Sequence, residues 1–169
     1  KILLPEALDP KAWWGGGLIF LDKKDRQILA FSAYPTGVYI INTNLVKEGE
    51  VASYRDMLNP KWKGKIVIND PTVAGVGLGS FTVAAYKLVG IDFFRELAKQ
   101  EPVVLRDQRQ MVEWVAQGKS AVCLYPKPEI VNEFLNAGAP IKELFPKEGG
   151  YVAAGGGNVG LINRAPHPN

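Results

Sequence analysis

The sequence predicts an α/β fold with a mixed, mainly parallel sheet flanked by helices. Between residues 65 and 124, short runs rich in β-branched residues alternate with segments of helical period. Alternation of this kind is typical of strand–helix–strand units, in which helices cover the faces of a largely parallel sheet. Glycine, proline and asparagine also stand at many of the boundaries between these segments, where the chain has to turn.

The composition excludes several classes of partner. The chain has 169 residues, of which 47% are apolar and 22% are charged, and this is ordinary for one globular domain. The net charge is only +3, and no basic run is longer than the pair at 23–24. Nucleic acid and anionic membrane surfaces are therefore poor candidates for partners. No apolar run approaches the roughly 20 residues that are needed to cross a bilayer.

The cysteine and histidine content argues against metal and triad chemistry. Cys123 is the one cysteine and lies in the apolar run 121–124, where a thiol usually belongs to the core, a reactive thiol being the alternative. No disulfide can form within the chain, and ligands for a zinc or iron–sulfur site are lacking. His167 is the one histidine and stands between two prolines near the end of the sequence. We expect no catalytic residues, no cofactor and no metal.

The elements follow from local patterns, taken in chain order. Three central strands are predicted at 65–69, 103–105 and 120–124, with strands at 38–42 and 151–154 adjoining them. A capping box at 53–56 predicts a short helix that ends near Leu58. Further helices are expected at 80–89, at 91–100, from an N-cap at Asp107 to Gly118, and at 129–136.

A glycine-rich segment after the strand at 66–69 is the first candidate for a ligand site. Gly75, Gly77 and Gly79 alternate with apolar residues, and helical period begins at Ser80. A helix that begins after such a loop can bind an anion, because its first amides have no partner within the helix. Close packing of the helix on the sheet is the alternative explanation of the glycines. A dinucleotide fingerprint is a poor match, because Ser80 stands where the third glycine is needed.

Three loops should meet at one edge of the sheet. The loops at 70–79, 106–108 and 125–128 all leave carboxyl ends of predicted strands, where ligands of such sheets bind. The candidate ligand-binding residues from these loops, with Lys127 close by, are Thr72, Gly75, Gly77, Ser80, Arg106, Asp107, Gln108, Arg109 and Tyr125.

The charges at this edge favour a solute that carries an anionic group. Ser80 and Asp107 are each expected to begin a helix whose free amides create positive potential. Arg106 and Arg109 add formal charge beside one of these helices. The alternative is that the two arginines pair in solvent with Asp107 or Glu113, which is common and contributes little.

Several stretches together resemble the substrate-binding proteins of bacterial ABC importers, in the extracellular solute-binding family that includes ferric-iron binders. The stretches are 39–46, 54–66 with its Trp-Lys-Gly-Lys segment, 109–122 and 165–169. The resemblance implies a three-layer lobe of a type II periplasmic binding protein, and capture of a small solute in a cleft between two lobes without catalysis. It also implies a membrane permease as partner, and a periplasmic or extracellular, membrane-associated location.

The same resemblance divides the chain into parts. Residues 1–41 correspond to a remnant of the other lobe with the outgoing hinge strand, residues 42–150 to one complete lobe, and residues 151–169 to the return hinge strand with a truncated tail. This mapping implies a lobe fragment. Trp13, Trp14 and Ile19 are then expected to be poorly covered, or to be covered by a second copy in a homodimer.

One departure from the family pattern argues against ferric iron. Iron-binding members carry adjacent tyrosines after the strand that corresponds to 121–124. Here Tyr125 is followed by Pro126 and Lys127. A lone phenolate is a poor ferric site, and the lysine repels a cation. A small organic or phosphorylated solute is therefore favoured.

Two other functions are open on the sequence alone. A Rossmann-like enzyme domain that binds a nucleotide or a phosphorylated substrate would use the glycine loop, with Asp70 and Asp107 as its acid–base pair. A ligand-sensing regulatory domain is the third possibility. It ranks last, because no basic or helix-turn-helix-like stretch is present.

Overall fold

The computed structural model describes residues 9–13, 16–22, 28–30, 34–36, 38–153 and 158–160. The chain separates into two compact units, one formed by residues 1–35 and 152–169 and the other by residues 36–151. Two residues of interest, Trp14 and His167, lie outside the described residues.

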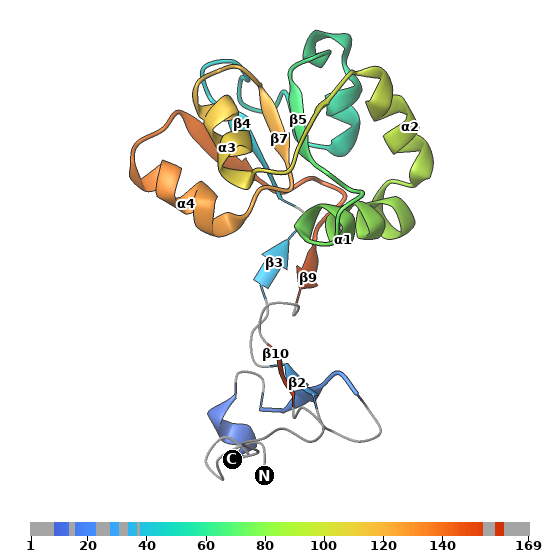
Figure 1. Ribbon diagram of the computed structural model, residues 1–169, viewed down its shortest axis with the longest axis vertical. Coiled ribbons are helices and arrows are strands. Elements are labelled where there is room, and N and C mark those ends of the chain that lie inside the picture. The colour runs from blue at the N-terminus through green and yellow to red at the C-terminus, as the bar shows by residue number, and fades with distance from the viewer. Residues whose placement is uncertain are drawn as a thin grey trace. The chain divides into compact units, whose positions relative to one another are not determined.

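The larger unit is built on a five-stranded mixed sheet (Figure 1). Its strands, in the spatial order β6-β5-β7-β4-β8, are Val103–Leu105, Ile66–Asn69, Val122–Leu124, Tyr39–Asn42 and Ile141–Leu144. β5 lies parallel to β6 and to β7, whereas β4 runs antiparallel to β7 and to β8. The predicted α/β fold with a mixed sheet and flanking helices is confirmed.

Helices cover both faces of this sheet and complete three layers. The elements are η3 (Tyr54–Leu58), η4 (Pro60–Trp62), α1 (Val76–Val83), the π-helical turn η5 (Ala84–Leu88), α2 (Ile91–Lys99), α3 (Gln108–Ala116) and α4 (Pro128–Asn136). In Figure 1, α3 and α4 lie on one side of the sheet, and α1 and α2 lie on the other. The predicted capping box is confirmed, because the side chains of Ser53 and Asp56 each accept from the other's backbone N–H.

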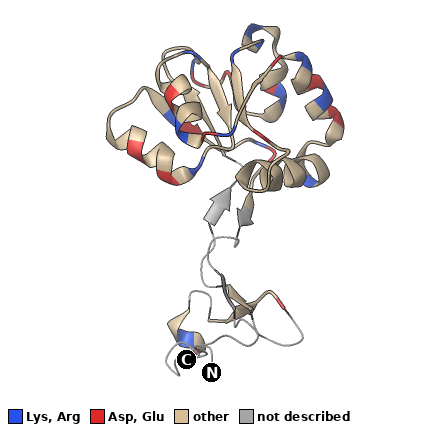
Figure 2. Cartoon of the chain, in the orientation of Figure 1, with Lys and Arg blue, Asp and Glu red and all other residues tan. Residues whose placement is uncertain are grey.

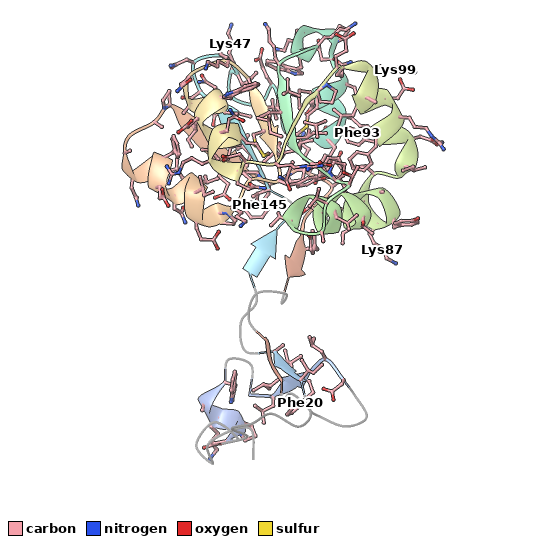
Figure 3. All side chains as sticks on the ribbon, viewed as in Figure 1. Phe20, Lys47, Lys87, Phe93, Lys99 and Phe145 are labelled. Carbon is pink, nitrogen blue, oxygen red and sulfur yellow. The ribbon has the colours of Figure 1, made fainter. Side chains whose placement is uncertain are left out.

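Successive side chains along each strand point to opposite faces of the sheet, so that an apolar core forms on each face. Ile40, Val67 and Cys123 face α3 and α4, and the thiol of Cys123 is fully buried as expected. Neighbouring positions of the same strands face η3, α1 and α2, where Phe93 points inward while Lys87 and Lys99 point away (Figure 3). β4, β5 and β7 are buried throughout because both of their faces are covered.

Two predicted positions in the sheet are wrong. Val103–Leu105 forms an edge strand, since β5 is its one neighbour among the described strands. The strand predicted at 151–154, observed as β9 (Tyr151–Ala153), pairs with β3 (Tyr34–Thr36) in a separate two-stranded sheet. The position beside β4 is occupied by β8, which follows β7 and α4 in the chain and, like β7, runs antiparallel to β4.

The smaller unit contains η2 (Pro10–Ala12), β1 (Ile19–Phe20), β2 (Ile28–Ala30) and β10 (Asn158–Gly160), with β2 antiparallel to both other strands. Ile19 is 66% exposed, as expected. Trp13 is half-buried, so it is better covered than the sequence suggested. The homodimer stays a prediction.

The surface carries charges of both signs on α2 and α3, whereas the charged residues of α4 are both glutamates (Figure 2). Within the described ranges, no single helix is long and apolar enough to cross a membrane. The bent pair Val76–Leu88 and Ile91–Lys99 meets the length and composition test only when the two segments are taken together.

Candidate functional site

A small pocket lies where the chain leaves the carboxyl ends of β5, β6 and β7. The three loops predicted to meet at this edge do meet, and together they enclose about 180 Å³. The pocket is lined by Asn69, Asp70, Val73, Ala74, Gly75, Val76, Arg106, Gln108 and Lys127. Of the nine residues proposed from the sequence, Gly75, Arg106 and Gln108 line it.

The junction between β5 and α1 depends on glycine at two positions. Gly75 has φ 147° and ψ −158°, which a residue with a side chain rarely adopts. A Cβ atom at Gly77 would lie 2.5 Å from Oδ1 of Asn69 and 2.7 Å from the carbonyl oxygen of Asp70. The bare backbone at Gly77 therefore lets the first turn of α1 pack against the end of β5.

The predicted start of this helix at Ser80 is wrong, because α1 begins at Val76. Glycine disfavours helix, so Gly77 and Gly79 obscured the first turn in the sequence. Ser80 is buried within the helix, and its hydroxyl lies 3.0 Å from the hydroxyl of Tyr151. It does not line the pocket.

The two helices that begin at this edge differ in their caps. Gly75 gives α1 no side-chain cap. By contrast, Oδ1 of Asp107 accepts from the N–H groups of Arg109 and Gln110, at 2.8 and 3.0 Å. The expectation of free amides at the start of α3 is therefore wrong, although Asp107 is the N-cap that was predicted.

Asp70 and Arg106 form an ion pair at the wall of the pocket. Nε of Arg106 donates to Oδ2 of Asp70 at 2.8 Å, and the backbone and hydroxyl of Thr72 donate to Oδ1 at 2.9 and 2.6 Å. The hydroxyl of Thr72 first and Arg106 second lower the pKa of Asp70 to about 2. Thr72 itself is exposed and serves this carboxylate rather than the pocket.

Gln108 joins the second loop to the third. Its Oε1 accepts from the backbone N–H of Lys127 at 2.9 Å, and both residues line the pocket. Among the described residues, no carboxylate pairs with the ammonium group of Lys127, which is exposed. The sequence pointed to Lys127 only as a neighbour of the site.

Tyr125 occupies a strained position but points away from the pocket. Its φ is 59°, which is uncommon for a residue other than glycine. The side chain is 1% exposed, and its hydroxyl donates to that of Tyr54 at 3.1 Å. Burial, and then the neighbouring Tyr54, raise the pKa of Tyr125 well above its usual value. The structure therefore presents this phenol as a neutral core group.

Arg109 also lies away from the pocket. Its guanidinium group pairs with Glu133 on α4 and lies 5.7 Å from the ring of Phe134. Arg106 pairs with Asp70, so neither arginine takes the partners, Asp107 or Glu113, that the sequence suggested as the alternative. The partners come from other elements, which sequence spacing does not reveal.

The residues that sequence reasoning missed lie at the end of β5. Nδ2 of Asn69 donates to the carbonyl oxygen of Leu105 at 3.3 Å and so ties β5 to β6 beneath the pocket. Val73, Ala74 and Val76 complete the wall. Their position after a predicted parallel strand was the available signal, because the residue types themselves carry no ligand chemistry.

A larger cavity of about 590 Å³ lies beside the edge strand β6. It is lined mainly by apolar side chains of η5, α2 and β6, such as Ile91, Phe94 and Val104. Its one carboxylate, that of Glu101, is 2.8 Å from Nζ of Lys63. This cavity lacks the convergent polar groups that orient a polar solute. Across the described ranges, no group of three or more His, Cys, Asp and Glu could hold a metal ion.

Comparison with known proteins shows the fold. No family model matches the chain. No curated protein matches it either.

Solved structures do match the chain, at similar coverage but with different identities and TM-scores. A two-component system protein described as mediating signal transduction aligns over 86% of this chain and 48% of its own length, with 24% identity and a TM-score of 0.72. The periplasmic binding protein AfuA from Actinobacillus pleuropneumoniae, with fructose-6-phosphate bound, aligns over 86% and 53%, with 21% identity and a TM-score of 0.57. Iron-bound HitA from Pseudomonas aeruginosa aligns over 86% and 46%, with 18% identity and a TM-score of 0.55.

The chain thus spans about half the length of these proteins. At these identities the likeness defines the fold, which is the mixed sheet with flanking helices of periplasmic binding proteins.

Proposed function

We propose that this chain supplies one wall of the solute site in the substrate-binding component of an ABC-type importer. Its fold is shared with the substrate-binding protein of an ABC transporter from Agrobacterium tumefaciens and with the periplasmic binding protein AfuA. In this proposal the protein captures a small solute between two lobes and delivers it to a membrane permease, without chemical change, in the periplasm or outside the cell and associated with the membrane. Residues 42–150 are the complete lobe, and the flanking residues belong to the hinge strands and the other lobe.

The solute presents an anionic group, such as a carboxylate or a phosphate, to this lobe. The observation that carries this proposal is the convergence of Arg106, Gln108 and Lys127 on one pocket of about 180 Å³ at the carboxyl ends of parallel strands. That volume suits a single small charged group. The uncapped start of α1 at Gly75 adds backbone donors on the same side.

Two other functions are less well supported. Tyr125 is the candidate phenolate ligand for ferric iron, and it is buried with its hydroxyl bonded to Tyr54. A Rossmann-like enzyme needs a base that is active near neutral pH. Asp70 has a pKa of about 2, and Asp107 is engaged as the cap of α3.

Titration of the 169-residue chain with sulfate, phosphate and acetate, followed by amide NMR shifts, tests this proposal. We expect saturable shifts at Gly75, Val76, Gln108 and Lys127, with a dissociation constant on the order of millimolar because one lobe leaves the anion partly solvated. Lys127→Ala should weaken binding, whereas Lys87→Ala, which removes an exposed lysine that points away from the fold (Figure 3), should not. Shifts confined to remote lysines would overturn the proposal.

A further inference from the structure

The orientation of the Gln108 amide is fixed by its neighbour. Gln108 is the first residue of α3 and lies in the wall of the pocket. The backbone N–H of Lys127 can only donate, so the atom that faces it at 2.9 Å must be the oxygen of the side-chain amide. The nitrogen, Nε2, is then left to donate elsewhere, and it has no hydrogen-bond partner among the described residues.

The carboxylate of Asp70, which also lines the pocket, accepts hydrogen bonds within the protein on both of its oxygens. Oδ1 of Asp70 accepts from Thr72, and Oδ2 accepts from Nε of Arg106. Arg106 uses only Nε in this contact, so its terminal nitrogens are available as donors. Lys127 contributes an ammonium group. The side chains of Arg106, Gln108 and Lys127 thus offer donors to a solute.

We infer that Gln108 is the residue that sets the specificity of this pocket, and that it selects a fully ionised group that only accepts hydrogen bonds. Sulfate, a phosphoryl dianion and a carboxylate belong to this class. Amides and protonated acids replace part of these acceptors by donors, and ammonium groups only donate, so each of them matches the donors of the pocket less well. Gln108 does so because its oxygen is held by the third loop, which prevents the amide from turning to accept. The inference rests on the proposed function and adds the chemical class of the solute.

Two substitutions of Gln108 distinguish a role in ligand specificity from a role in positioning the loop that contains Lys127. Gln108→Glu keeps an oxygen for the N–H of Lys127 and replaces the Nε2 donor by a second carboxylate oxygen. Gln108→Ala removes both contacts. With sulfate as the probe, we expect Gln108→Ala to weaken binding by roughly tenfold, as for the loss of one hydrogen bond to a charged group. We expect Gln108→Glu to weaken it by a clearly larger factor, because the introduced charge repels the anion.

The sulfate affinity of the variants, measured as a function of pH, shows an effect that a purely positioning role of Gln108 would not produce. Sulfate keeps its charge between pH 7 and pH 4.5, and Asp70 stays ionised because its pKa is about 2. Protonation of the introduced carboxyl group turns it into a donor, so the affinity of Gln108→Glu should recover as the pH falls. The same series on Gln108→Ala corrects for the other charged groups near position 108, which include Asp70, Arg106, Asp107, Arg109 and Lys127.

Each outcome decides one claim. If the unaltered chain shows no sulfate shifts at Gly75 and Val76, the proposed function is wrong and the inference with it. If the unaltered chain binds sulfate there but Gln108→Glu binds as well as it does, or shows no recovery at low pH, the specificity role is wrong and the proposed function stands. Greater weakening by Gln108→Glu than by Gln108→Ala, with recovery at low pH, supports the inference.

Discussion

Two strand-to-helix junctions lie at the same edge of the sheet and are built in opposite ways. Between β5 and α1 the chain uses glycine, and Gly77 lets the backbone of the helix approach Asn69 and Asp70. Between β6 and α3 the chain uses a charged side chain, and Asp107 occupies the first amides of the helix. The first junction leaves backbone donors uncapped, whereas the second presents side chains, those of Arg106 and Gln108, to the pocket.

Equivalent places in one fold can therefore offer hydrogen-bond donors by different means, from the backbone or from side chains. A capped helix cannot offer the same amides to an anion, since the cap already accepts from them. Side chains that flank the cap remain available, because they point away from the helix axis. Substitutions test how far the first junction depends on glycine and the second on the Asp107 cap and the side chains beside it.

The largest effect should come from Gly77→Ala. The added Cβ would overlap Asn69 and the backbone of Asp70, so the free energy of unfolding should fall by about 1–3 kcal/mol. Gly79→Ala is the matched control, because its Cβ would lie 3.7 Å from the hydroxyl of Tyr151 and has room. Urea unfolding of both variants measures the difference. Equal stabilities would show that the first junction does not depend on close approach.

Asp107→Ala should cost about 1 kcal/mol of stability, since it removes the N-cap of α3. Its sulfate affinity should not fall, because Asp107 does not line the pocket. Asp92→Ala is the control, as Asp92 stands in the first turn of α2 without capping it. Thermal unfolding and an anion titration together check this prediction. A loss of sulfate binding would mean that Asp107 is a ligand after all.

Asp70 should make stability depend on acid pH. Its pKa of about 2 in the folded chain lies below the ordinary value of 3.8, so the hydrogen bonds from Thr72 and the ion pair with Arg106 stabilise the fold above about pH 4. This contribution should disappear as the pH falls from 4 to 2. Urea unfolding across that range should show a smaller decline for Asp70→Asn than for the unaltered chain. Identical slopes would contradict the assignment.

The smallest effect is expected from Arg109→Ala. Arg109 and Glu133 are more than half exposed, so their pair should contribute at most about 0.5 kcal/mol. Sulfate affinity should stay unchanged, in contrast to Arg106→Ala, which removes a lining residue. Parallel anion titrations of the two variants make the comparison. A similar loss of affinity in both would show that the pocket is wider than its observed lining.

Much of the fold and part of the site could be predicted from local sequence. The capping box at Ser53, the N-cap at Asp107 and the central strands β5 and β7 were all evident, because their signals lie within a few residues of one another. The meeting of the three loops also followed, since parallel strands place their carboxyl ends together. The start of α1 could not be predicted, because glycine has a low helix propensity and the first turn of α1 contains Gly77. This turn forms because Gly77, without a side chain, can pack closely against Asn69.

The sequence by itself determined the class of fold and the edge of the sheet at which the three loops meet. Only the tertiary structure decided which side chains reach that edge. Tyr125 turned inward to Tyr54, Arg109 crossed to Glu133, and Ser80 was buried against Tyr151. The physical reason is that a side chain's direction is set by partners far away in the chain, whereas strands and caps are set by neighbours.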